Sequence, residues 1–210
     1  MPDYELIPGL YLAPSPAGAY YAASSANPDV SRRILLSLMA EQASPELTAE
    51  SLPALTGLEL APALEYLHRM QSMNLVQGLR EPRRMLDGAL EKVLPGILAD
   101  LAGRNKALLA DEQGFYLASH GFHHETAEEL AGLSADLGTL HQRHQGLISG
   151  NLSLQTSAWA LISAGGNSEI GFWPLYIGQQ RFVLILTGLP NLNQAATVDL
   201  VWALAQRYGH

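Results

Sequence analysis

The sequence has no cysteine among its 210 residues. This absence excludes disulfides, thiol catalysis and metal sites built from thiolates, and it gives no sign of an oxidising compartment. Charged residues are also scarce, at 15% of the chain against about 25% in a typical globular protein. Because hydrophobic residues make up 48% of the chain, we expect apolar surface that a second copy or a partner protein covers.

Strongly basic segments are missing as well. Residues 1–30 carry a net charge of −3, residues 31–84 a net of 0 and residues 85–210 a net of −5, which together give −8. None of these segments offers the positive charge that usually attracts a nucleic-acid backbone. DNA is therefore a disfavoured partner.

Long hydrophobic runs are absent too. No apolar stretch reaches the roughly 18 residues that a membrane-spanning helix needs. The first ten residues, MPDYELIPGL, contain acids rather than the basic segment that opens a signal peptide. We therefore expect a cytoplasmic protein without a membrane span.

The first 30 residues are rich in proline, alanine, serine and tyrosine. GLYLAP and GAYYAAS can form two short strands around the turn PSPAG, which predicts a β-hairpin. A loose N-terminal arm is the alternative for residues 1–30.

Residues 31–81 have the pattern of three helices and a short strand. Ser31 is a plausible N-cap for RRILLSLMAEQ, and Gly57 is a stop signal for a second short helix. The third helix is LELAPALEYLHRMQSMN, followed by the strand NLVQGL. This order is typical of a winged helix-turn-helix domain, with the third helix in the recognition position.

The recognition helix offers few side chains suited to reading bases. Glu59 and Glu65 face outward and would be repelled by phosphate. The possible DNA contacts on this helix and just beyond it are His68, Arg69, Arg80, Arg83 and Arg84.

The remaining residues, 85–210, alternate helices with strands. A helix is expected from Met85, interrupted by Pro95, before the hairpin LLADEQGFYLAS with its turn at Gly114. A long helix from His124 follows, then the strands SAWALIS, EIGFWPLYI and RFVLILT, and a last helix capped by Asn191 or Asn193. FVLILT is apolar almost throughout, so it is expected at the centre of a sheet covered on both faces.

This order resembles the roadblock (dynein light-chain) family, of profilin-like architecture. The residues that carry the resemblance are Asp111–Gly114 with FYLAS after them, the leucine-spaced helix, Pro174 and Leu175 in a strand, and the asparagine-led last helix. The predicted fold class is therefore α+β. It combines an N-terminal winged-helix domain with a C-terminal roadblock-like α/β/α domain that contains a five-stranded antiparallel sheet.

The resemblance implies a non-enzymatic adaptor. Roadblock domains form homodimers or heterodimers by joining sheet edges and pairing their second helices. In bacteria and archaea they commonly partner small Ras-like GTPases. Carried over to this chain, the dimer interface is expected at Leu133, Leu137, Leu140, His144, Trp159 and Leu161. SAWALIS has no charge or proline that would discourage strand pairing.

Catalytic and metal-binding patterns are weak. His120, His123 and His124 lie near one another in sequence, as do His141 and His144, but real zinc sites show tighter signatures. SAGGNS has neither the nucleophile elbow nor the lysine of a phosphate loop. We therefore expect no catalytic residue, metal or cofactor. A transcriptional regulator that uses its roadblock-like domain for dimerisation or sensing is the alternative function.

Overall fold

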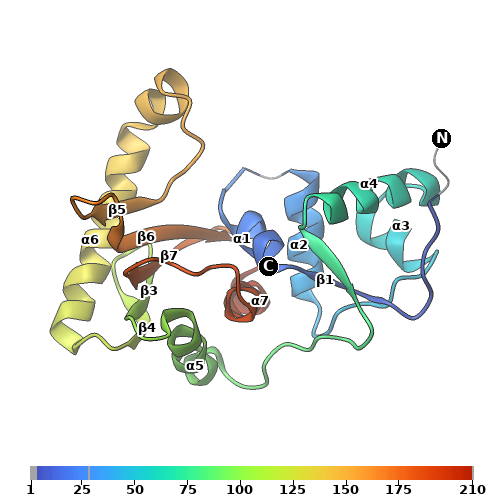
Figure 1. Ribbon diagram of the computed structural model, residues 1–210, viewed down its shortest axis with the longest axis horizontal. Helices are drawn as coiled ribbons and strands as arrows, with labels where there is room; N and C mark the ends of the chain where they lie inside the picture. The colour runs from blue at the N-terminus through green and yellow to red at the C-terminus, as the bar shows by residue number, and fades with distance from the viewer. Residues whose placement is uncertain (1–3, 28, 210) are drawn as a thin grey trace. The chain divides into compact units, whose positions relative to one another are not determined.

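The computed structural model describes residues 4–27 and 29–209 and divides into two compact units. Unit 1 comprises Met1–Ala23, Asn27–Asp87 and Leu192–His210, and unit 2 comprises Ser24–Ala26 and Gly88–Asn191. The chain thus leaves unit 1 after Asp87 and returns to it at Leu192 (Figure 1). Within the described residues, no helix has the length and apolar character needed to cross a membrane.

Unit 1 combines helices with a small sheet. The strands β1 (Tyr11–Pro14) and β2 (Val76–Leu79) pair antiparallel, and Tyr11 also bridges to Glu46. The helices are α1 (Pro16–Ala23), α2 (Val30–Ala40), α3 (Ser51–Thr56), α4 (Leu60–Ser72) and α7 (Ala195–Tyr208). The predicted helices and strand of residues 31–81 are all present, while the winged-helix assignment itself stays a prediction.

The structure corrects the expectation for GAYYAAS. This segment is helix α1, not a second strand or a loose arm. Ser15 caps it, because the Ser15 hydroxyl accepts a hydrogen bond from the Gly18 N–H at 3.0 Å. Pro16 then occupies the first helical position, where its missing N–H costs nothing. The cap signal Ser-Pro was therefore in the sequence but was interpreted as a turn.

Helix α2 also begins differently from the prediction. Its N-cap is Asp29, whose carboxylate accepts the Arg32 N–H at 2.9 Å, whereas Ser31 lies inside the helix. The Ser31 hydroxyl pairs with the Tyr66 hydroxyl instead, at 2.8 Å. The predicted stop of α3 at Gly57 is confirmed, since Gly57 takes the left-handed conformation with φ of 71°.

The last helix, α7, completes unit 1 although 104 residues of the chain (88–191) separate it from the rest of that unit. It packs against α1 and α2. Trp202 is fully buried, and its indole N–H donates to the Glu41 carbonyl at 2.8 Å. Gln194 is the N-cap residue, so the expected caps Asn191 and Asn193 are wrong.

Unit 2 is a five-stranded antiparallel sheet with helices, as predicted. Its elements are α5 (Leu90–Ala102), β3 (Ala107–Asp111), β4 (Tyr116–His120), α6 (His124–Arg143), β5 (Trp159–Ile162), β6 (Ser168–Ile177) and β7 (Gln180–Thr187). The strand order is β4-β3-β7-β6-β5. Helix α5 starts five residues later than the expected Met85 because Gly88, with φ of 129°, ends the preceding extended segment.

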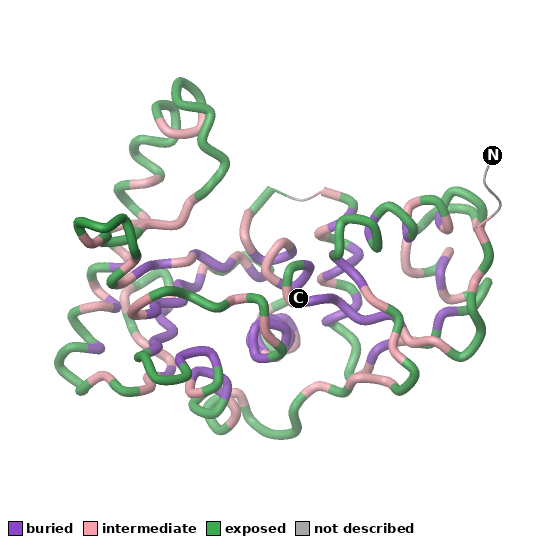
Figure 2. Tube along the Cα trace, viewed as in Figure 1, coloured by how far each residue is buried: buried purple, intermediate pink, exposed green. Residues whose placement is uncertain are grey.

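The sheet of unit 2 is buried between helices. On one face, Leu108, Val183, Ile185 and Phe172 form a core with α6. The alternate residues of β3 and β7 point to the other face, where α5 packs against β3 and β4. All residues from Phe182 to Leu186 are buried, which confirms that β7 is a central strand covered on both faces (Figure 2).

Candidate protein interface

Strand β5 forms one free edge of the sheet in unit 2. Among the described residues it pairs only with β6, so the backbone N–H and C=O groups of its outer side are not engaged in the sheet. Leu161 and Ile162 are 64% and 67% exposed. No charged residue or proline lies in residues 157–163. An edge of this kind is a ready template for another strand.

Helix α6 exposes leucines next to this edge. Leu133 and Leu140 are 43% and 38% exposed, whereas Leu137 packs into the core of the sheet. The buried face of α6 consists of Ala127, Ala131 and Ser134. These small residues, spaced four and three apart, mark the inner face, and sequence reasoning missed them because it followed the leucines.

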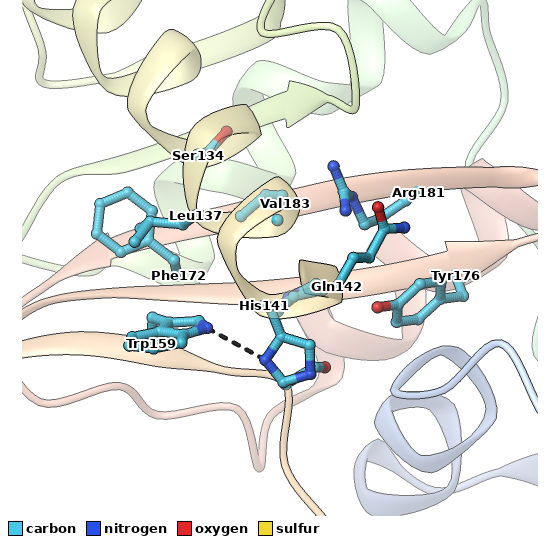
Figure 3. A pocket seen from close by; sticks show the side chains of 12 residues that line it. Ser134, Leu137, His141, Gln142, Trp159, Phe172, Tyr176, Arg181 and Val183 are labelled. Carbon is cyan, nitrogen blue, oxygen red and sulfur yellow. Dashed lines mark hydrogen bonds between the residues drawn. The ribbon is translucent and has the colours of Figure 1, made fainter. Parts of the chain in front are cut away.

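Trp159 connects β5 to α6. Its indole N–H donates to the His141 Nδ1 at 3.3 Å, and the two rings meet edge to face with centroids 6.3 Å apart (Figure 3). Trp159 is partly buried against the core that Phe172 and Leu137 share. Trp159 therefore positions the edge strand on the sheet, and Leu161 is the more exposed of the two residues expected on this strand.

An apolar hollow brings three of the predicted interface residues together. Beyond α6 the chain makes a turn of π-helix, η1 (Gly146–Asn151), and returns to β5 as an exposed segment (Figures 1 and 2). The hollow between these elements measures about 440 Å³. It is lined by Leu140, His141, His144, Leu147, Ile148, Leu152, Leu154, Thr156, Ala158 and Trp159. Leu133 and Leu161 are not part of it.

Two of the histidines considered for metal binding have other contacts. The His124 Nδ1 pairs with the Tyr116 hydroxyl at 2.7 Å, and His141 receives the Trp159 N–H. Within the described ranges there is no cluster of three or more histidine, cysteine, aspartate or glutamate residues that could hold a metal ion.

Several of the possible DNA contacts are engaged inside unit 1. His68 stacks on Tyr4 with ring centroids 4.6 Å apart. Arg83 forms a 2.7 Å ion pair with Asp199 of α7 and also donates to the Ala195 carbonyl at 3.0 Å. Arg69 lies 3.9 Å from Glu65 at the exposed surface. Arg80 and Arg84 are exposed.

Comparison with known proteins finds no matching family model and no matching curated protein. Several solved structures do match. A Roadblock/LC7 domain from Streptomyces avermitilis is similar with 17% identity and a TM-score of 0.36, over 54% of this chain and 91% of that one.

Two MglB structures match over 60% of this chain and 90% of their own, each with 18% identity. One is MglB from Myxococcus xanthus, with a TM-score of 0.34, and the other is MglB in a tetrameric arrangement, with a TM-score of 0.37.

Proposed function

We propose that this protein is a non-enzymatic homodimeric adaptor that associates through β5 and the exposed leucines of α6. The observation that carries the proposal is the bare, uncharged edge of β5 with Leu161 and Ile162 more than half exposed. Pairing of two such edges would satisfy their backbone groups and join the two sheets.

The apolar hollow supports the same arrangement. Leu140, Leu147 and Leu154 contribute apolar surface beside the edge, and a second copy would remove it from water. Burying one leucine or isoleucine side chain contributes about 1.5–3 kcal/mol. Because a two-fold interface uses each residue twice, Leu161 and Ile162 alone supply four such side chains.

Solution mass tests the homodimer directly. The wild-type chain should show twice its 22.7 kDa in sedimentation or light scattering at about 100 µM. Replacing Leu161 and Ile162 together by lysine should raise the dissociation constant at least about 100-fold, because like charges would face each other across the edge.

Leu189→Lys is the matched control for this experiment. Leu189 is 65% exposed and lies in the loop after β7, so its replacement should leave the mass unchanged. A wild-type chain that stays monomeric at this concentration overturns the homodimer, as does a double variant that still dimerises like the wild type.

The proposed partner of the dimer is a small Ras-like GTPase, as the roadblock resemblance implies. The GTPase would bring its own nucleotide, because this sequence has no phosphate loop. Affinity capture from the source cell with the folded wild-type protein should recover a small GTPase. Recovery of none from a verified dimer would reject the partner while leaving the homodimer intact.

A further inference from the structure

Arg181 has an unusual position in unit 2. It lies at the start of β7, opposite Tyr176 of β6 in the register. Its guanidinium group packs against the bare backbone of Gly138 on α6, and Figure 3 shows the Arg181 side chain among the residues around the hollow beside this helix. An added Cβ on Gly138 would stand only 2.3 Å from the Arg181 Nη1 and 2.4 Å from its Cζ. Because residue 138 of α6 is a glycine without a side chain, the Arg181 guanidinium has room to lie against this helix.

The guanidinium has no partner within residues 4–27 and 29–209. Arg181 forms no ion pair there, and its Nε is buried without a hydrogen bond. The half-buried arginines of unit 1 differ, since Arg32 pairs with Asp29 and Arg83 pairs with Asp199. Burying a charge is costly unless the charge is paired and hydrogen-bonded.

A small hollow lined by apolar as well as polar side chains adjoins this guanidinium, and none of the residues around it is acidic. Its polar lining comes from Ser134, His141, Gln142, Ser157, Tyr176 and Arg181. Two of these groups are already engaged, because the Ser134 hydroxyl donates to the Ala131 carbonyl and His141 accepts from Trp159. Tyr176, Gln142 and Ser157 bring a phenol, an amide and a hydroxyl, each able to donate a hydrogen bond.

The hollow is small. Its free volume is about 20 Å³, which is room for one or two waters or for a single carboxylate group. The forked donors of an arginine match the two oxygens of a carboxylate. A nucleotide or a sugar would not fit.

We propose that this hollow binds one carboxylate group, with Arg181 as its charged contact and Gly138 as the residue that makes room for the arginine. The carboxylate would belong to a free small acid or to an acidic side chain, and both present the same oxygens. Binding would neutralise the partly buried cation and hold α6 against β6 and β7. Leu161 and Ile162 do not line this hollow, which shares His141 and Trp159 with the apolar hollow beside the proposed dimer edge.

Thermal unfolding with acetate as the probe tests the site. A site with a dissociation constant of about 5 mM should raise the midpoint by about 3–5 °C when acetate replaces chloride at about 50 mM and equal ionic strength. Arg181→Met should abolish this shift and should unfold no earlier than the wild type without acetate, since it removes a partly buried charge whose Nε has no hydrogen bond.

Two further variants separate the roles of charge and geometry. Gly138→Ala keeps the arginine but displaces it, so the acetate shift should disappear there too. Arg143→Gln removes an exposed arginine of the same helix and should keep the full shift. If Arg181→Met does not fold, Gly138→Ala provides the decisive measurement.

A second probe distinguishes an acidic side chain from a free small acid as the source of the carboxylate. A glutamate blocked at both ends should give the same shift as acetate if the hollow takes an acidic side chain, and no shift if it takes only free small acids. An acetate shift that persists in Arg181→Met overturns the proposal. A wild type that does not respond to acetate, together with an Arg181→Met variant that unfolds earlier, would show that the arginine serves only packing.

Discussion

The two compact units use their apolar residues in different ways. In unit 1 the helices bury their apolar sides against one another, so that Leu35, Leu38 and Trp202 are all fully buried. In unit 2 the sheet is equally well covered at β7, yet Leu140, Leu161 and Ile162 remain exposed at α6 and β5. Unit 1 also exposes single apolar side chains such as Ile7 and Met73, but those of unit 2 gather around α6, η1 and β5, where they leave apolar surface available for association.

The largest expected effect tests how far unit 1 depends on α7. Trp202→Ala should lower the free energy of unfolding of unit 1 by about 3–5 kcal/mol, because it leaves a cavity and removes the hydrogen bond to Glu41. Hydrogen exchange measured by mass spectrometry should show lost protection in α1 and α2. Leu189→Ala, at an exposed position of unit 2 outside the proposed dimer edge, should change stability by less than about 0.5 kcal/mol. Equal effects of the two changes would contradict the comparison.

A smaller effect is expected from Arg83. Arg83→Ala removes the partly buried ion pair with Asp199 and the exposed hydrogen bond to the Ala195 carbonyl, and should cost about 1–2 kcal/mol. Chemical denaturation measures this loss. Retention on DNA at low salt should be the same for both proteins, because Arg83 is engaged within unit 1. A variant with full stability but weaker DNA retention would restore the DNA-contact hypothesis for this residue.

The smallest effect concerns Asp29. Partial burial acts to raise the pKa of its carboxyl group, but hydrogen bonds from the Arg32 N–H and the Tyr21 hydroxyl, together with the Arg32 charge, hold the pKa below its usual value. The folded state thus favours the ionised form. Its stabilisation is present above the unfolded pKa of about 4 and is lost as the pH falls through the lower folded value.

Asp29→Asn tests this dependence. The variant should lose part of the stability near pH 7, at most about 1 kcal/mol, since asparagine still caps helices. The stability difference from the wild type should shrink below about pH 4, where the wild-type carboxyl group becomes protonated. Urea unfolding at several pH values measures it. A difference that stays constant down to about pH 2 would contradict the assignment.

Much of the architecture could be predicted from local patterns. The apolar run at residues 182–187 indicated a buried central strand, and Gly114 marked the hairpin, where it adopts a φ of 91°. Asp111 stabilises that turn by accepting the Gln113 and Phe115 N–H groups at 2.9 Å. Such signals are readable because they depend on neighbouring residues alone.

Other features depend on distant parts of the chain and were missed. The apolar pattern of α7 predicts a helix but cannot specify that it packs with α1 and α2. The leucine spacing of α6 suggested a single seam, but the structure divides these leucines: Leu137 packs into the core, whereas Leu133 and Leu140 are exposed. The pairing of Arg181 with Gly138 joins two residues 43 positions apart. Glycine in a helix gives no indication of which side chain will lie across it.

The return of the chain to unit 1 at Leu192 has a consequence for synthesis. Residues emerge from the ribosome in order, and most domains fold as soon as their own segment is available. Here α1 and α2 cannot pack against α7 until Trp202 and Gln206 of that helix have been synthesised. Unit 1, most of which is synthesised first, is therefore completed last. All segments of unit 2 have been synthesised before α7 completes unit 1.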